Sequence, residues 1–288
     1  MELLKNSTII PLEGTMGSFT GGVFSSDGSF IEDSVLYRGK PAQLQKPVEY
    51  LYGTFIYGGC LFRHFGHFIF ESLSRLYAIR QCKNYPILFI SPDDGYREFF
   101  KLLGVNNEIR IINVPTYIEN LVYSRQGSAL VPPNIIDEQI NALKYYYFNL
   151  NEKKSNEKIW LSRSKLLFGT ILNESAIEKI LTKFGYKIIH PEILSLQEQV
   201  RLISTSKIVA GFDGSQFYSL LFAIEISSKF HIFNRRSKIP DEIPYALQKR
   251  NVEFELHHFD VEYVCGQGAP SYYMHSEPEK VIEVLRNL

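Results

Sequence analysis

Four titratable side chains recur at helical spacing within residues 60–77. His64, His67, Glu71 and Arg75 share one narrow arc of a helical wheel, beside an arc of apolar residues. Imidazole has the unperturbed pKa nearest neutrality, and a carboxylate one turn away can fix its tautomer. We therefore predict a helix that presents His67 as a general base, with Glu71 orienting it or acting as the base itself. The alternative is a structural His67–Glu71 pair on a polar helix face.

A second candidate site lies between a predicted buried strand and a predicted helix, in the sequence Gly211-Phe212-Asp213-Gly214-Ser215. Free backbone N–H groups at a helix start bind anions, and glycine lets a phosphate group approach the chain closely. The turn therefore indicates an anion-binding site around Gly214 and Ser215. The alternative is an ordinary strand-to-helix turn in which Asp213 or Ser215 caps the helix.

A third candidate site is basic. Ser162-Arg163-Ser164-Lys165 stands at the carboxyl end of a predicted strand, where doubly wound folds bind ligands. The guanidinium of Arg163 suits a diphosphate because its fork donates two parallel hydrogen bonds. The alternative is a basic loop in which Arg163 and Lys165 simply face solvent.

Composition narrows the remaining function classes. The 288 residues carry 31 basic and 31 acidic side chains, so the formal net charge is zero and we expect no nucleic-acid partner. The three cysteines are widely spread, without a CxxC pair, which favours a reducing compartment. HExxH is absent, and His64, His67 and Glu71 have no fourth ligand nearby, so we expect no metal and no bound cofactor.

The first 14 residues hold no apolar run long enough for a signal peptide or a membrane span. We therefore expect a cytoplasmic protein. Peripheral association with the inner face of the cell membrane stays open, and so does the formation of a homo-oligomer.

Predicted strands and helices alternate along most of the chain, which favours parallel sheets with helices on their faces. The polar segment 151–157 lacks apolar anchors and is the best linker candidate. We predict an α/β protein of two Rossmann-like lobes facing each other across a cleft, 1–154 and 155–288, with a β-hairpin extension around Asp27-Gly28. The C-terminal helix, 278–288, is a candidate for crossing back to the first lobe. The other expected helices are 94–103, 135–150, 173–184, 195–205 and 215–226, and the expected strands are 50–57, 86–91, 108–113, 120–124, 158–162, 186–190, 207–210, 230–233 and 252–259.

Taken in order, these motifs resemble glycosyltransferase family 61, which includes transferases of bacterial capsular and surface polysaccharide clusters. The family pattern His-aromatic-x-x-Glu-x-Leu-x-Arg-Leu is similar to the segment 67–76 of this chain. The pairs Ser162-Arg163 and Asn173-Glu174 and the turn 209–215 follow in the family's order. The resemblance extends from about residue 20 to residue 235.

The resemblance implies a two-lobed transferase of the GT-B type that needs no metal and inverts the anomeric configuration in a single displacement. Its co-substrate would be a nucleotide sugar, and its acceptor an oligosaccharide or a lipid-linked glycan. The first lobe would face the acceptor, with His67 and Glu71 catalytic and His64 and Arg75 in contact with the acceptor. The second lobe would bind the donor through Arg163, Lys165, Asp213, Gly214 and Ser215. In that set the Asp213 carboxylate would face ribose, base or sugar hydroxyls, because it repels phosphate.

The chain departs from the family pattern in the second lobe. The family has Gly-x-His-Gly-Ser/Ala followed by Asn, whereas this chain has Asp213 at the His position and Ser219 near the Asn position. A second arginine expected after Arg163 is missing around Phe168-Gly169. The alternative function is therefore a non-catalytic nucleotide- or glycan-binding protein of the same fold.

Overall fold

A computed structural model describes residues 1–14, 18–36, 39–91, 95–144, 154–266 and 271–288. The chain divides into two compact units, Met1–Tyr147 and Phe148–Leu288, and each is described by itself. The predicted boundary, between residues 154 and 155, lies a few residues after the boundary of these two units. The end of the predicted helix 135–150 and the start of the predicted linker 151–157 fall outside the described residues.

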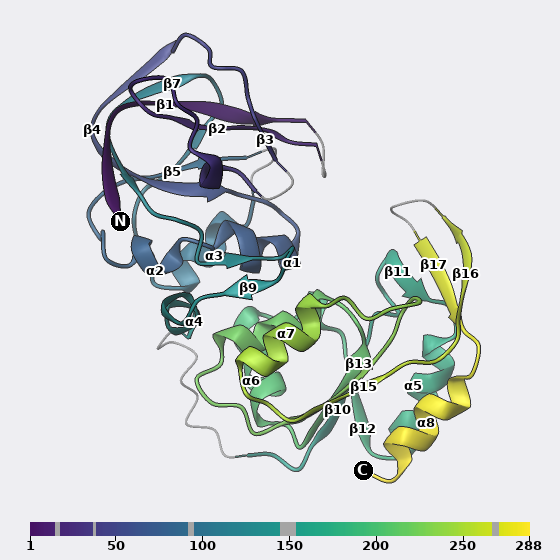
Figure 1. Ribbon diagram of the computed structural model, residues 1–288. Helices are drawn as coiled ribbons and strands as arrows, with labels where there is room; N and C mark the ends of the chain where they lie inside the picture. The colour runs from purple at the N-terminus through teal and green to yellow at the C-terminus, as the bar shows by residue number, and fades with distance from the viewer. Residues whose placement is uncertain (15–17, 37–38, 92–94, 145–153, 267–270) are drawn as a thin grey trace. The chain divides into compact units, whose positions relative to one another are not determined.

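The first unit holds a seven-stranded sheet and a separate two-stranded one (Figure 1). The strands are β1 (Glu2–Glu13), β2 (Thr20–Phe24), β3 (Lys40–Pro41), β4 (Glu49–Cys60), β5 (Ile87–Ile90), β6 (Ile109–Ile112), β7 (Thr116–Tyr123), β8 (Ser128–Ala129) and β9 (Asn134–Ile135). The large sheet has the order β3-β2-β1-β7-β4-β5-β6, and β8 pairs with β9.

The large sheet follows the parallel prediction only in part, and its short edge strand β3 also pairs in parallel with β2. β4 pairs in parallel with β5 and β7, and β5 pairs in parallel with β6. β1 pairs antiparallel with β2 and β7, so the sheet is mixed. The sequence prediction misses β1 because Asn6, whose φ is 54°, and Pro11 interrupt its strand pattern.

The predicted hairpin is present only in part. Gly28, whose φ is 83°, closes the turn with a hydrogen bond from its N–H to the Ser25 carbonyl at 3.0 Å. The second arm shrinks to a single bridge between Phe24 and Phe30, and the start of β2 pairs with β3 and with β1 on its two edges.

Short helices accompany the parallel half of this sheet. All four residues of β5 are buried, as expected for a parallel strand covered on both faces. The helical segments of the first unit are η1 (Glu32–Ser34), α1 (Phe65–His67), η2 (Phe68–Ser72), α2 (Leu76–Ile79), α3 (Arg97–Leu102) and α4 (Asp137–Leu143).

The second unit holds a five-stranded, wholly parallel sheet in the order β12-β10-β13-β14-β15, which is consistent with a Rossmann-like lobe. A smaller three-stranded sheet, β11-β17-β16, stands beside it and is absent from the sequence prediction. The strands are β10 (Lys158–Leu161), β11 (Phe168–Ile171), β12 (Tyr186–Ile189), β13 (Ile208–Phe212), β14 (Lys229–Phe233), β15 (Phe254–His257), β16 (Val261–Gly266) and β17 (Ser271–His275).

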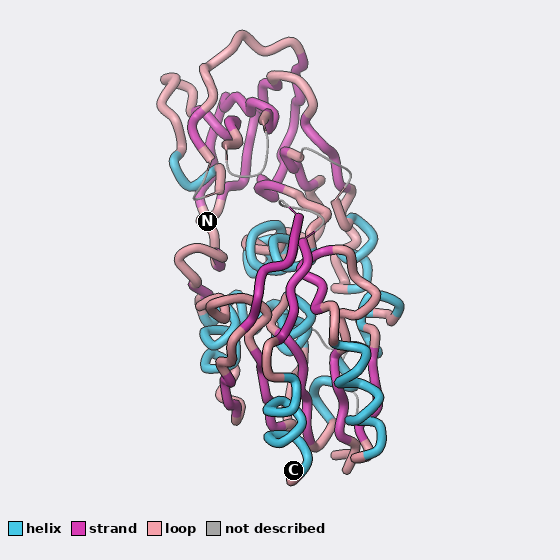
Figure 2. Tube along the Cα trace, turned by 90° about the vertical axis from the view of Figure 1, so that its right-hand side faces the viewer, coloured by secondary structure: helices cyan, strands magenta, loops and turns pink. Residues whose placement is uncertain are grey.

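Helices cover both faces of the five-stranded sheet, with α5 and α8 on one side and α6 and α7 on the other (Figures 1 and 2). Ser195 and Glu198 form a capping box at the start of α6. The helical segments are α5 (Glu174–Lys183), η4 (Pro191–Ile193), α6 (Leu196–Thr205), η5 (Ser215–Phe222), α7 (Glu242–Lys249) and α8 (Pro278–Arg286).

The C-terminal helix α8 belongs to the second unit. Its Val281 and Leu285 are fully buried in the same apolar cluster as Trp160 and Phe233 of the five-stranded sheet. The prediction that this helix crosses back to the first lobe is therefore wrong. Every helix in the described part of the chain is too short or too polar to cross a membrane.

Candidate active site

The predicted catalytic helix of the first unit is not one continuous α-helix. α1 ends at His67, and the chain then widens into the π-helical turn η2, in which the Leu73 N–H bonds to the Phe68 carbonyl five residues back at 2.9 Å. α2 begins only at Leu76, after a break at residues 73–75. The helical-wheel arc predicted from the sequence therefore holds for His67 and Glu71 and ends there.

His67 and Glu71 meet at the start of the π turn. His67 Nδ1 and Glu71 Oε2 are 2.5 Å apart, and the two side chains are 16% and 11% exposed. A carboxylate at Nδ1 favours the tautomer in which Nδ1 carries the proton and Nε2 keeps its lone pair. This is the state that a general base requires.

His64 lies beside this pair on the exposed side. Its ring is 4.9 Å from the His67 ring, centroid to centroid, in an edge-to-face arrangement. The structure thus brings together three of the four residues predicted for the acceptor side.

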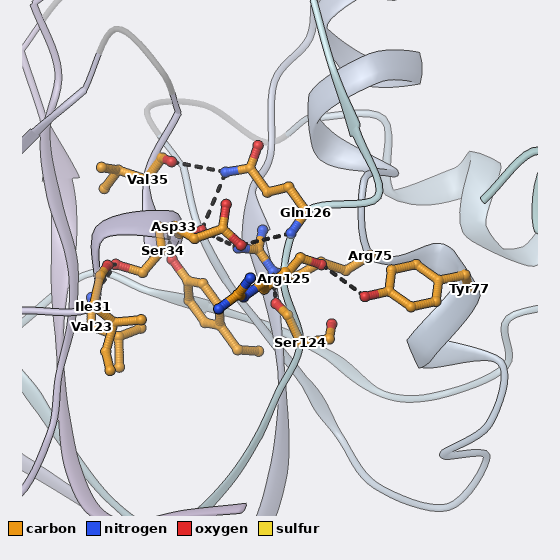
Figure 3. Close-up of polar contacts among 11 residues, drawn as sticks. Val23, Ile31, Asp33, Ser34, Val35, Arg75, Tyr77, Ser124, Arg125 and Gln126 are labelled. Atoms are coloured by element: carbon orange, nitrogen blue, oxygen red, sulfur yellow. Dashed lines mark hydrogen bonds and ion pairs between the residues drawn. The ribbon is translucent and has the colours of Figure 1, made fainter. Parts of the chain in front are cut away.

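Arg75, the fourth, lies in the interior of the first unit (Figure 3). It is 1% exposed; its Nε donates to the Ser124 carbonyl at 2.8 Å, and its Nη2 donates to the Asp33 carbonyl. The guanidinium also lies over the rings of Tyr57 and Tyr123, at 5.1 and 5.5 Å from their centroids. We therefore correct the prediction for Arg75: its charge is used inside the fold, and the π turn removes it from the arc of His67.

The second unit places Arg163 directly after β10. The side chain is 6% exposed; Nη1 donates to Gln216 Oε1 at 2.9 Å and Nη2 to the Phe168 carbonyl at 2.8 Å. Nε has no hydrogen-bond partner among the described residues. Burial first, and then the nearby charge of Arg235, lower the pKa of Arg163 to about 10.

A buried carboxylate holds the backbone at this point. Glu174, at the start of α5, accepts hydrogen bonds through Oε1 from the Trp160 ring N–H and the Arg163 backbone N–H, both at 3.0 Å. Burial raises the pKa of Glu174 to about 7.

Asp213 has a different place from the predicted one. It is fully buried, and its Oδ1 accepts a hydrogen bond from the Arg235 backbone N–H at 2.5 Å, while Oδ2 lies 3.6 Å from Arg235 Nε. It therefore neither caps the following helix nor faces a ligand hydroxyl. It holds Arg235, which follows β14 and which the sequence prediction misses.

The Arg235 guanidinium lies at Gly169, close to where the second arginine of the family pattern is missing from the sequence. A Cβ added to Gly169 would lie 1.7 Å from Arg235 Nη1, so the absence of a side chain at 169 leaves room for this guanidinium. The neighbouring Phe168 carbonyl accepts from Arg163. Two guanidiniums thus lie at the first two residues of β11.

The glycine turn after β13 also differs from its prediction. Ser215 begins the 3₁₀-helix η5 and no α-helix, and no side chain caps its start. A Cβ on Gly214 would lie 2.4 Å from Arg163 Nη1, so this glycine makes room for that guanidinium. Ser215 is half-buried, and Lys165 is exposed in the turn after β10. Ser219 is buried, and its hydroxyl donates to the Gln216 carbonyl at 2.8 Å.

The sequence contains a signal that points to Arg235. It stands just after the predicted strand 230–233, at the same carboxyl edge of the sheet as Arg163. Because doubly wound folds bind ligands at this edge, Arg235 is as good a candidate for a ligand contact as Arg163. Glu174 belongs to the Asn173-Glu174 pair of the family pattern, but nothing in the sequence indicates its contact with Arg163. Gln216 carries no signal of its own.

A comparison with protein-family models matches residues 65–228 to the family described as Glycosyltransferase 61. The match covers more than half of the chain, so the protein belongs to this family of enzymes. The matched span contains His67, Glu71, Arg163 and Asp213, but ends before Arg235. Among curated proteins, none matches the chain.

Proposed function

We propose that the protein is an inverting, metal-independent glycosyltransferase. It moves a sugar from a nucleotide-activated donor to an oligosaccharide or lipid-linked acceptor during synthesis of a bacterial capsular or lipopolysaccharide glycan. The reaction takes place in the cytoplasm, at the inner face of the cell membrane. Family membership supports the transfer of a sugar, and the charges of the second unit support the nucleotide donor.

The observation that carries the donor assignment is the pair of guanidiniums beside residues 168 and 169. Two cations close together in a buried place repel each other, and the Asp213 carboxylate makes its direct contacts with Arg235. A diphosphate supplies the missing negative charge and can accept from the unpartnered Nε of Arg163. We assign Lys165 and the backbone N–H groups of Gly214 and Ser215 to the same anion as weaker contacts.

The acceptor chemistry belongs to the first unit. His67 Nε2 removes the proton from the acceptor hydroxyl as its oxygen attacks the anomeric carbon, and the bond from that carbon to the diphosphate oxygen breaks. The electron pair of that bond leaves with the diphosphate, whose charge Arg163 and Arg235 stabilise. Glu71 stabilises the imidazolium that forms, and the exposed His64 contacts the acceptor.

A panel of nucleotide sugars, read by thermal shift and by slow hydrolysis, tests the donor assignment. A donor that binds only the native state must raise the melting temperature. Hydrolysis or transfer identifies an enzyme, whereas a shift without any turnover favours the non-catalytic binding protein. The absence of any shift across the panel would contradict the donor site.

The variants His67→Ala and Glu71→Gln separate catalysis from architecture. We expect His67→Ala to fold and bind donor normally while transfer falls by about 10²–10⁴-fold, the usual contribution of a general base. Glu71→Gln should lose less than His67→Ala if Glu71 only orients the ring. If both variants melt at a lower temperature but keep their specific activity, the pair is structural and the assignment is wrong.

Metal independence has its own test. We expect the initial rate to persist in excess EDTA, because the guanidiniums supply the positive charge that a divalent ion supplies elsewhere. Loss of activity that only Mg²⁺ or Mn²⁺ restores would contradict this mechanism.

A further inference from the structure

A histidine–carboxylate cluster lies on the five-stranded sheet of the second unit, away from the residues assigned above. β14 and β15 pair in parallel, with His231 opposite Glu255 and Phe233 opposite His257. Because alternate residues of a strand point to the same face, His231, Glu255 and His257 share one face. All three residues lie outside the span matched to the glycosyltransferase family.

Three ligand atoms lie close together. His231 Nδ1 and His257 Nε2 form a hydrogen bond of 3.1 Å between nearly parallel rings, and Glu255 Oε2 lies 3.9 Å from the first nitrogen and 4.0 Å from the second. Two imidazole nitrogens bound tetrahedrally to one zinc ion at 2.0–2.1 Å would be about 3.3 Å apart. The nitrogen pair is near this spacing, and a bound ion would replace the hydrogen bond between the rings. Binding requires both rings to turn toward the ion and the carboxylate to rotate, which its half-exposed side chain permits.

The surroundings hold the three residues next to one another. His231 is 1% exposed within a central strand, and the His257 ring stacks on the Phe233 ring with centroids 4.7 Å apart. Lys229 Nζ binds Glu255 Oε1 at 2.8 Å, which leaves Oε2 turned toward the imidazoles. Outer-shell partners of this kind orient metal ligands, and Glu253, 2.9 Å from the same ammonium, offsets its charge.

We propose that His231 Nδ1, Glu255 Oε2 and His257 Nε2 bind a divalent transition-metal ion of the zinc type, with a fourth position open to water. Two imidazoles and one carboxylate form a zinc ligand set, and an ion held here links the edge strand β15 to β14. The site is independent of the transfer reaction and takes no part in it.

The test uses the full-length protein after EDTA treatment and removal of the chelator. We expect calorimetry with ZnCl₂ to give one equivalent of bound ion, and Co²⁺ to give the visible absorption of a tetrahedral site. His257→Gln and Glu255→Gln should each weaken Zn²⁺ binding at least tenfold. The neighbouring, exposed His258 provides a matched control, and His258→Gln should bind like the wild type.

Two outcomes would overturn the proposal. One is wild-type protein that takes up no Zn²⁺ at micromolar concentration. The other is His257→Gln and Glu255→Gln protein that binds Zn²⁺ as tightly as wild type, which would place the ion elsewhere in the chain. Melting curves in EDTA confirm that the variants are folded, because metal-free wild type and variants should then melt within a few degrees of each other.

Discussion

Arg75 in the first unit and Arg163 in the second are both less than a tenth exposed, and each guanidinium lies where a glycine has no side chain. A Cβ on Gly59 would be 2.5 Å from Arg75 Nη1, and one on Gly214 would be 2.4 Å from Arg163 Nη1. From the sequence, both arginines are candidates for ligand contacts. Their surroundings differ in two respects, hydrogen bonding and neighbouring charge.

The surroundings of Arg75 satisfy its charge within the fold. Burial by itself lowers the pKa of Arg75, but Tyr123, Tyr57 and Asp33 outweigh it, and the pKa is raised. Asp33 is itself held by the Gln126 backbone N–H at 2.7 Å (Figure 3). Such an arginine has a structural role.

Arg163 has the opposite balance. Its Nε lacks a partner among the described residues, the charge with the largest effect on its pKa is the cation Arg235, and burial and this charge lower the pKa to about 10. A buried donor without a hydrogen-bond partner costs free energy, so the arrangement favours a bound anion. Burial alone therefore does not distinguish Arg75 from Arg163, whereas the direction of the pKa shift and the unpartnered Nε of Arg163 do.

Replacing Arg75 gives the largest expected effect on stability. Arg75→Met leaves the buried Ser124 carbonyl and the other acceptors of this guanidinium without a donor. We therefore expect the free energy of unfolding of the first unit to fall by about 3–5 kcal/mol. The loss should appear in far-ultraviolet circular dichroism during urea unfolding. Trp160, the single tryptophan, lies in the second unit and supplies a control through its fluorescence. Unchanged stability together with a raised KM for the acceptor would return Arg75 to the acceptor site.

Replacing Arg163 should act on the donor. We expect Arg163→Ala to weaken nucleoside-diphosphate binding by about 1.5–3 kcal/mol in calorimetry, the worth of a charge-assisted hydrogen bond. Arg163→Lys should recover only part of this, because the planar fork is lost. Arg235→Ala should lose a similar amount of nucleoside-diphosphate affinity. The alternative of a solvent-facing basic loop around Arg163 does not predict this loss. An unchanged dissociation constant in both alanine variants would remove the pair from the donor site.

Gly169→Ala should act indirectly and more weakly. Its Cβ would displace the Arg235 guanidinium without removing it, so we expect donor binding to fall by about 1 kcal/mol. Gly169 also has a φ of 57°, so strain alone lowers stability. Gly185→Ala is the matched control, since its φ is 81° but an added Cβ would meet no atom within 4 Å. Equal donor affinity in the two variants would contradict the role given to Gly169.

The sequence predicts the second unit better than the first. Strands and helices alternate there with clear signals, such as the capping box at Ser195, and the predicted elements 158–162, 173–184 and 186–190 occur close to their expected bounds. In the first unit the sequence prediction misses β1. The residues that interrupt its strand pattern are tolerated because β1 pairs with β2 on one side and with β7 on the other. Local patterns do not contain such pairings.

The candidate site divides in the same way. His67 and Glu71 are neighbours along the chain, so their spacing predicts their contact correctly. The π turn that removes Arg75 from their arc depends on packing and leaves no mark in the helical wheel. Arg235 reaches Gly169 across more than sixty residues of sequence, a contact that only the folded chain defines.

The ionisation of Glu174 provides the subtlest test, since it concerns the support beneath Arg163. Burial raises the pKa of Glu174 from 4.5 to about 7, so between these values the folded chain binds a proton that the unfolded chain lacks. The free energy of unfolding therefore falls as pH rises from about 4.5 to about 7. Above pH 7 the contribution of Glu174 to it no longer changes.

We expect Glu174→Gln to flatten this slope, measured by urea unfolding at several pH values. At pH 7 the substitution should change the free energy of unfolding by less than about 1 kcal/mol. The weaker hydrogen bonds of Gln destabilise the fold, whereas the loss of a buried charge stabilises it. The Trp160 ring N–H donates to Glu174, so tryptophan emission should titrate near pH 7 in wild type and stay flat in the variant. Emission that is flat in wild type would mean that Glu174 stays ionised near pH 7. The electrostatic balance around Arg163 would then resemble that of Arg75, and the contrast between the two arginines would disappear.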